Sequence, residues 1–397
     1  MAGIYLHIPF CKSKCHYCNF FSLASQKLKV PFLPALEREI DLTREYLGGE
    51  TVQTIYFGGG TPSLYSPMAL QGLMERVTSP PGPSPGGYTS PPDPSPAGEG
   101  RIVRPADMEI TIELNPEDVT EEYVAGLRKT WFNRFSLGVQ SFDDGDLRTL
   151  NRAHSAAQSM RAVTLLKEAG YGNISIDLIY GIPGSESSGW EKNLEIAFSL
   201  GVPHISAYAL TVEARTPLAW MIERKKSAPV SDELQEKQFR TLVERTKANG
   251  YLQYEISNFC KPGHHAIHNT NYWNGVPYLG LGPSAHSYDG RSRRWNISSL
   301  SGYITAISKG EPVFESEQLT PDQRYNEYVM TSLRTMWGCN GKKIIFDFGI
   351  TIYDLFKKGI MPMIGQGWVT KKEEVYYLTD EGKLFADRVA SALFITG

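Results

Sequence analysis

Three of the five cysteines fall within one short run near the amino terminus, Cys11-Lys-Ser-Lys-Cys15-His-Tyr-Cys18. Thiolates with this C-x3-C-x2-C spacing can converge on one soft metal centre, and iron–sulfur clusters are held by such ligands. A structural zinc site completed by His7 or His16 is one alternative. A thioredoxin-like redox pair of Cys15 and Cys18 is a second, but it would leave Cys11 without a role. The spacing favours an iron–sulfur cluster and leaves zinc open.

A second run that could bind a cofactor is His268-Asn-Thr-Asn-Tyr272-Trp273. Imidazole is a usual axial ligand of heme iron, and Tyr and Trp rings supply flat apolar faces for a porphyrin. A single histidine beside aromatic residues is, however, more often a hydrogen-bonded core residue. His264 and His265 are alternative ligands in the same segment. The pattern alone therefore leaves heme binding as one of two interpretations.

Composition restricts the remaining possibilities. The chain has 397 residues with 40 basic and 43 acidic side chains, so no basic excess indicates nucleic acid. No apolar run approaches the roughly 18 residues that cross a bilayer, and the amino terminus lacks a signal-peptide pattern. Cys260 and Cys339 stand alone and are expected to be small buried hydrophobes. We therefore expect a cytoplasmic protein without a transmembrane segment or a nucleic-acid partner.

The elements that would position these residues alternate along the first half of the chain. Strand-like runs lie at Ile4–Ile8, Thr54–Phe57, Met108–Leu114, Phe135–Val139, Ile174–Ile179 and His204–Ala209. Helix-like stretches lie between them at Pro34–Leu47, Met68–Val77, Glu121–Lys129, Ala157–Ala169 and Glu191–Leu200. Such alternation predicts an α/β fold with a parallel sheet. Six strands are too few for a closed eightfold barrel, so we expect a partial (β/α)6 barrel.

Two further regions differ from this pattern. Residues 78–100 are rich in Pro, Gly and Ser and have almost nothing to bury, which predicts a disordered insertion. Residues 316–397 combine helix-like stretches with a hairpin-like pair of strands, which indicates a smaller α+β module resembling a winged helix. We therefore expect a barrel domain over residues 1–315, including the His268–Trp273 run, and a carboxyl-terminal domain over residues 316–397.

The motifs together resemble a known family. The run from Tyr5 to Cys18 resembles the cluster motif of the radical S-adenosylmethionine (SAM) superfamily. Within it, the chain resembles the branch of oxygen-independent coproporphyrinogen III dehydrogenases (HemN) and heme chaperones (HemW). The likeness continues through Gly58-Gly-Gly-Thr-Pro-Ser63, Glu113-Leu-Asn-Pro116, Gly138-Val-Gln140-Ser-Phe142, Leu150-Asn-Arg152-Ala-His154 and Asp177-Leu-Ile-Tyr-Gly-Ile-Pro-Gly184. The last 80 or so residues resemble the carboxyl-terminal domain of the HemN type.

The resemblance implies cofactors and residue roles. Cys11, Cys15 and Cys18 would hold a [4Fe–4S] cluster whose open iron is chelated by SAM. An electron from the cluster would then cleave SAM to methionine and a 5′-deoxyadenosyl radical. The residues implied to contact SAM are Tyr5, Tyr17, Gly60, Thr61, Glu113, Gln140, Arg152, Asp177, Ala209 and His286. The residues implied to bind heme are His268, Tyr272 and Trp273.

Three features favour the chaperone within this branch. Phe20 stands where HemN-type enzymes have a further cysteine, only ten residues precede Cys11, and the His268–Trp273 run resembles the HemW heme-binding signature. The implied function is transfer of heme to recipient hemoproteins such as membrane respiratory enzymes, with flavodoxin or ferredoxin as electron donor. The alternative is oxidative decarboxylation of coproporphyrinogen III. Whether the protein is itself an enzyme stays open.

Overall fold

The computed structural model describes residues 1–79 and 108–396 of the chain. Its main feature is a curved sheet of 12 strands in the order β12-β11-β10-β9-β1-β2-β3-β4-β5-β6-β8-β7. Neighbours from β1 to β6 are parallel, and β9 is also parallel to β1. The strands are β1 (Ala2–Ile8), β2 (Val52–Gly59), β3 (Glu109–Leu114), β4 (Arg134–Gln140), β5 (Ile174–Tyr180), β6 (His204–Ala209), β7 (Leu252–Glu255), β8 (Asn258–Cys260), β9 (Tyr278–Leu281), β10 (His286–Tyr288), β11 (Ser292–Asn296) and β12 (Phe314–Gln318).

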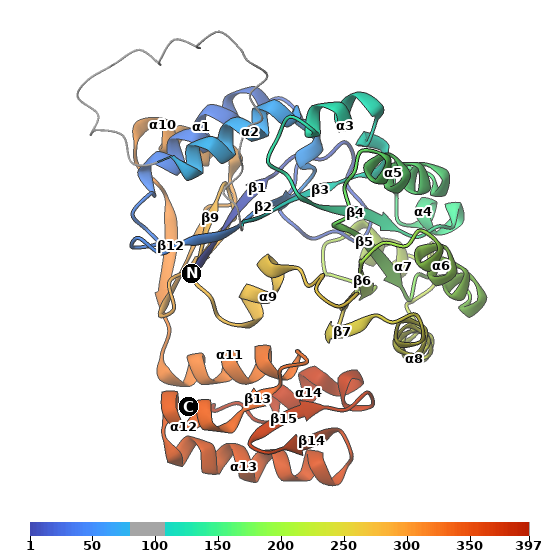
Figure 1. Cartoon of the computed structure of the whole chain (residues 1–397), viewed down its shortest axis with the longest axis vertical. Helices are drawn as coiled ribbons and strands as arrows, with labels where there is room; N and C mark the ends of the chain where they lie inside the picture. The colour runs from blue at the N-terminus through green and yellow to red at the C-terminus, as the bar shows by residue number, and fades with distance from the viewer. Residues whose placement is uncertain (80–107, 397) are drawn as a thin grey trace.

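Helices cover the outer side of this sheet, and one short helix, α9, lies on its inner side (Figure 1). The helices up to the last strand of the sheet are α1 (Lys29–Leu42), α2 (Pro67–Thr78), α3 (Glu121–Leu127), α4 (Asp144–Thr149), α5 (Ala156–Glu168), α6 (Ser187–Ser199), α7 (Pro217–Glu223), α8 (Asp232–Ala248), α9 (Ile267–Trp273) and α10 (Leu300–Lys309). Side-chain caps fix several helix starts. Ser66 caps α2 ahead of a proline, and Ser155 and Gln158 form a capping box at α5.

The six parallel strands alternate between two kinds of side chain. Apolar residues such as Ile110, Ile112 and Phe135 belong to the hydrophobic core that packs against the helices. The residues between them are polar and buried, and they face the inside of the barrel. They include Thr54, Glu109, Thr111, Arg134, Ser136, Ser175, His204 and Ser206. Because successive side chains of a strand point to opposite faces, this pattern gives the barrel an apolar outer layer and a polar interior.

The carboxyl-terminal region forms a second core beside the open side of the barrel (Figure 1). Its antiparallel sheet has the order β13-β15-β14. Its elements are α11 (Pro321–Leu333), β13 (Cys339–Asn340), α12 (Gly341–Phe348), α13 (Ile350–Gly365), β14 (Val369–Lys372), β15 (Val375–Leu378) and α14 (Ala386–Ser391). The hairpin predicted near residues 367–378 is the β14–β15 pair.

The predicted α/β class and partial barrel are confirmed, with three differences. The sheet extends beyond the six strands on both edges, through β9, which is parallel to β1, and through short antiparallel strands, none of which the sequence pattern revealed. Helix α1 begins at Lys29 rather than Pro34, with Pro34 inside it. The domain boundary expected at residue 315 falls inside β12, which remains paired with β11 through Gln318.

Residue 78 ends α2, and most of the expected disordered insertion at 78–100 lies outside the described residues. In the described part of the chain, no helix is both long and apolar enough to cross a membrane.

Candidate functional site: a cavity at the carboxyl ends of the barrel strands

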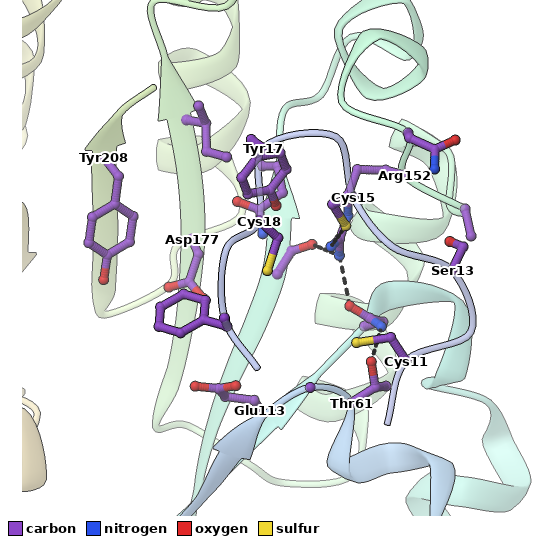
Figure 2. A pocket seen from close by; sticks show the side chains of 18 of the residues that line it. Cys11, Ser13, Cys15, Tyr17, Cys18, Thr61, Glu113, Arg152, Asp177 and Tyr208 are labelled. Atoms are coloured by element: carbon purple, nitrogen blue, oxygen red, sulfur yellow. Dashed lines mark hydrogen bonds between the residues drawn. The ribbon is translucent and has the colours of Figure 1, made fainter. Parts of the chain in front are cut away.

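A cavity of about 440 Å³ opens at the carboxyl ends of the parallel strands (Figure 2). Its size lies within the range of small-molecule sites, and its place is where barrel folds carry their ligands. All three clustered cysteines line it, together with ends of β2 to β6. The sequence-predicted SAM residues that line it are Tyr17, Gly60, Thr61, Glu113, Gln140, Arg152, Asp177 and Ala209.

The cysteine loop follows β1 and brings Cys11, Cys15 and Cys18 to the cavity wall (Figure 2). Burial raises the pKa of the Cys11 and Cys18 thiols. Bound iron would favour their thiolate forms, since metal binding displaces thiol protons. In the part of the chain that the structure describes, no three Cys, His, Asp or Glu side chains are already gathered as metal ligands. The fit of a cluster therefore rests on three thiols that face one cavity.

The two histidines considered for a zinc site are engaged elsewhere. His7 is 5% exposed, and its Nε2 lies 2.8 Å from the carbonyl oxygen of Phe21. Its Nδ1 lies 3.0 Å from the Tyr5 hydroxyl. His16 Nδ1 lies 2.9 Å from the carbonyl oxygen of Thr149. Neither histidine lines the cavity, so neither completes a zinc site with the three thiols that face it in this conformation.

The glycine run at the end of β2, from Gly58 to Gly60, has no space for side chains. A Cβ atom on Gly60 would lie 2.5 Å from the Phe10 carbonyl oxygen, and one on Gly59 would lie 2.5 Å from the His7 ring. Gly59 also has a φ of 103°, a conformation that favours glycine. The loop is thus held directly against the start of the cysteine loop. It leaves backbone groups and Thr61 at the cavity wall.

Arg152 connects the cysteine loop to two strand ends. One nitrogen of its guanidinium, Nη1, donates to Cys15 Sγ at 3.3 Å. Nη2 donates to Asn115 Oδ1 at 2.7 Å and to the Gly138 carbonyl oxygen at 2.8 Å. Asn115 in turn donates to Thr61 Oγ1 at 3.0 Å, as the dashed lines in Figure 2 show. A planar guanidinium with several donors suits this bridging role. Its hydrogen bonds become stronger when the acceptor is charged, as a thiolate or a bound carboxylate is.

Of the four acidic side chains that line the cavity, Glu113 and Asp177 lie on the barrel strands. Burial raises the pKa of Glu113 from 4.5 to about 7, although hydrogen bonds from Tyr56 Oη and the Gly59 N–H lower it. Burial also raises the pKa of Asp177 to about 6, against the stabilising effect of hydrogen bonds from Ser206 and Ser136. SAM carries a sulfonium and an ammonium group. Two carboxyls that ionise near neutral pH in a cavity give it favourable partners.

Gln140 reaches the cavity through an unusual backbone conformation. It ends β4 with a φ of 66°, where the pairing with β5 shifts register. Such conformations are sparsely populated for residues other than glycine and occur often at functional sites. The register shift redirects the strand end, so that the Gln140 side chain joins the cavity wall.

Two predicted SAM residues do not line the cavity. Tyr5 lies deeper in the barrel and hydrogen-bonds His7. His286 lies on β10, where its ring stacks on Trp295 with centroids 5.8 Å apart. Sequence reasoning also missed Asn115 and Tyr208, both of which line the cavity. Asn115 was visible inside the motif Glu113-Leu-Asn-Pro116, whereas Tyr208 had no signal of its own. Phe20, two residues after Cys18, also lines the cavity and is 67% exposed.

The predicted heme residues lie at the opposite end of the barrel. His268 belongs to α9 and is 2% exposed. Its Nδ1 lies 2.8 Å from Thr54 Oγ1, its Nε2 lies 2.9 Å from Tyr272 Oη, and its ring stacks on Tyr56. Both ring nitrogens are therefore occupied in this conformation. Trp273, by contrast, lies under the guanidinium of Arg334 from the carboxyl-terminal region.

Comparison with known proteins agrees with this geometry. Residues 5–197 match the radical SAM superfamily, and residues 319–385 match the HemN C-terminal domain. The chain is 31% identical to the heme chaperone HemW of Bacillus subtilis over 99% of both chains. It is 31% identical to the Escherichia coli HemW over 96% of this chain and 95% of that protein. The chain belongs to the HemW family of radical SAM proteins.

A solved structure supports the fold. The coproporphyrinogen III oxidase HemN of Escherichia coli superposes with a TM-score of 0.80 at 22% identity, covering 99% of this chain and 90% of that one. Membership of the radical SAM superfamily implies a [4Fe–4S] cluster and SAM. The cavity offers thiols, backbone groups and carboxyls of the kinds that these two groups require.

Proposed function

We propose that this protein is a heme chaperone, which binds a [4Fe–4S] cluster, SAM and heme and transfers heme to recipient hemoproteins. The observation that carries this proposal is the likeness to HemW proteins along the whole chain, including the region of the predicted heme segment. Phe20 at the cavity further distinguishes the chain from the HemN-type enzymes, which have a cysteine at that position in the family pattern.

Cys11, Cys15 and Cys18 are the proposed cluster ligands, since they are the three thiols that face the cavity. When bound, the cluster supplies an electron for cleavage of SAM. The residues proposed to hold SAM are Tyr17, Gly60, Thr61, Glu113, Gln140, Arg152, Asp177 and Ala209. Among them, Arg152 would pair with the SAM carboxylate, while Glu113 and Asp177 would face its cationic groups. Tyr5 and His286 lie away from the cavity wall, so they have no direct role in this proposal.

Heme binding is proposed for the segment that contains α9. Ligation of iron by His268, with Tyr272 and Trp273 against the porphyrin, requires that α9 leave its present position, because both nitrogens of His268 are bonded internally. His265 is the competing ligand, since its buried Nε2 has no hydrogen-bond partner. Its ring contacts Tyr254 and the half-exposed Trp337. The exposed face of Trp337 offers a flat apolar surface beside it.

The proposal extends to partners and location. The recipients would be hemoproteins such as membrane respiratory enzymes, and the electron donor a flavodoxin or a ferredoxin. A cytoplasmic location is consistent with described helices that are too short or too polar to span a membrane.

The deciding experiment is anaerobic reconstitution of the cluster followed by heme titration and by incubation with coproporphyrinogen III, SAM and a reductant. The chaperone proposal expects stoichiometric heme uptake, release to an apo-hemoprotein, and no protoporphyrinogen IX. Robust conversion of coproporphyrinogen III would instead support the HemN-type activity. Comparison of His268→Ala with His265→Ala then assigns the iron ligand, because only the ligand variant loses the Soret shift of the bound heme.

A further inference from the structure

A continuous set of contacts joins the predicted heme segment to the opposite end of the barrel. Tyr56, in the middle of β2, is its central residue. One face of the Tyr56 ring stacks on His268, with centroids 5.0 Å apart and an angle of 28° between the rings. The Tyr56 hydroxyl donates to Glu113 Oε1 at 2.8 Å. Glu113 lines the cavity and accepts a second hydrogen bond from the Gly59 N–H at 3.2 Å.

His268 is itself fixed on every side that the contacts describe. Thr54 and Tyr272 occupy its two nitrogens. The carboxylate of Glu109 accepts hydrogen bonds from the backbone N–H groups of Ile267 and His268, at 3.0 and 2.8 Å, and so fixes the start of α9. A Cβ atom on Gly3 would lie 3.3 Å from the His268 ring, so the adjacent strand also packs against it. The ring can therefore act as a rigid support.

The other end of this set is equally crowded. A Cβ atom on Gly58 would lie 2.8 Å from Glu113 Oε1 and 2.8 Å from Cε1 of Tyr56. The Glu113 carboxylate and the Tyr56 ring fill the space that a side chain at Gly58 would take, and the hydrogen bonds from Tyr56 and the Gly59 N–H hold the carboxylate on its cavity side. Stacking on His268 supports one face of the Tyr56 ring. Residues that do not touch the ligand can in this way keep a side chain that does touch it in one orientation.

We propose that Tyr56 and His268 are positioning residues of the cavity, which hold Glu113 in the orientation and charge state that bind SAM. This rests on the proposed function in one respect, namely that SAM occupies the cavity. The buried histidine of the predicted heme segment thus acts on the SAM site through Tyr56, from the far end of the barrel.

Burial raises the pKa of Glu113, and the groups that face the carboxyl modify this effect. Tyr56 and the Gly59 N–H donate to it, and both favour the carboxylate. Asp177 on β5 opposes its ionisation, while Tyr5 on β1 and Tyr272 on α9 lie close enough to interact with its charge. Removing the Tyr56 hydroxyl therefore favours protonated Glu113. SAM, which is cationic at its sulfonium, binds best when Glu113 is ionised.

The test is equilibrium binding of SAM to the reconstituted protein between pH 5.5 and 9. Tyr56→Phe keeps the ring and should move the midpoint of the pH profile upward by about 1 unit, which weakens binding roughly fivefold near pH 7 and leaves it unchanged near pH 9. His268→Gln should shift the midpoint in the same direction. In the Tyr56→Phe background, His268→Gln should have no further effect on the midpoint, because His268 acts through Tyr56.

His204→Gln is the matched control. His204 is also buried, at 1% exposed, and is bonded to Ser175 Oγ and Tyr254 Oη, yet it has no contact with Tyr56. Its variant should lose a similar amount of stability and leave the pH profile unchanged. The proposal is overturned if Tyr56→Phe weakens binding equally at every pH, if His268→Gln behaves as His204→Gln does, or if the two shifts add.

An infrared titration separates this proposal from the proposed function. The band of the protonated carboxyl that disappears in Glu113→Gln reports the Glu113 midpoint in the chain without SAM. Tyr56→Phe should move that midpoint upward even if the protein takes up no heme or binds SAM weakly. An unmoved band overturns the inference, whereas a moved band without heme uptake leaves it standing and refutes only the chaperone function.

Discussion

The effect of His268→Ala on the free energy of unfolding distinguishes two interpretations of His268, a packed structural residue and an exposed iron ligand. The ring is 2% exposed and bonds Thr54 and Tyr272, and Thr54 is itself fully buried. The variant removes the partner of the buried Thr54 hydroxyl and of the part-buried Tyr272 hydroxyl, at about 1–3 kcal/mol for each at most. It also removes the ring from a packed contact with Tyr56, which adds a cavity contribution. We expect a loss of about 3–6 kcal/mol in the free energy of unfolding.

Urea unfolding of the cluster-free chain, followed by far-ultraviolet circular dichroism, measures this loss. A loss of that size is a large share of the 5–15 kcal/mol typical of folded proteins, so the midpoint should fall clearly. His286→Ala is the control, because His286 is exposed and only its ring face contacts Trp295. That variant should lose less than about 1 kcal/mol. If His268→Ala loses no more than His286→Ala does, His268 is not a packed core residue and the proposed support of Tyr56 fails with it.

Three further predictions concern the cavity. Iron incorporation on anaerobic reconstitution should be abolished by each of Cys11→Ala, Cys15→Ala and Cys18→Ala. It should be retained in Cys260→Ala and Cys339→Ala, which change buried positions away from the cavity. Zinc without iron in the wild-type protein would contradict this prediction. Arg152→Lys should keep iron but lower the cluster's reduction potential, because the hydrogen bond to Cys15 Sγ is lost, and voltammetry should find the exposed Arg148→Lys unchanged. The raised pKa of Glu113, from 4.5 to about 7, stabilises the cluster-free fold below pH 4.5, and this contribution is lost as the pH rises through 7. Glu113→Gln should therefore flatten the decline in urea midpoint between pH 5 and 8, and parallel curves for the two proteins would contradict the shift.

The sequence predicted the parts of the site that depend on local chemistry. The spacing of the cysteines placed three thiols on one loop, and the glycines at the end of β2 indicated a close backbone approach, which requires glycine at position 60. The strand pattern predicted that the carboxyl ends of the parallel strands would lie together at one edge of the sheet. Asp177, however, lies three residues before the end of β5, and it reaches the cavity because it faces inward. Its inward orientation follows from the two-residue period of a strand.

Other features depend on contacts between distant segments and left no local signal. In the sequence, Tyr56 is only one aromatic residue of a predicted buried strand. Its contacts with Glu113 and His268 become known from the fold alone. The polar residues between the apolar positions of β2 to β6 were a usable signal. Thr54, Glu109 and Ser175 alternate with core residues, which indicates a polar barrel interior rather than strands buried on two apolar faces. The aromatic residues near His268 suggested a porphyrin surface, and the hydrogen bond and edge-on ring contact between Tyr272 and His268 in this conformation had no signal of their own.

The position of α9 determines how the two proposed ligands affect each other. If His268 binds heme iron, α9 leaves the barrel, Tyr56 loses its stacking partner, and Glu113 is no longer held for SAM. Coupling between two binding sites is reciprocal, so SAM in the cavity would then weaken heme binding by the same factor as heme weakens SAM binding. If His265 is the ligand, α9 can stay in place and the two affinities are independent. Whether SAM and heme weaken each other's binding therefore identifies the iron ligand. Mutual weakening would also show that occupation of the radical SAM cavity controls heme loading, whereas independent affinities would show that the two sites only share one fold.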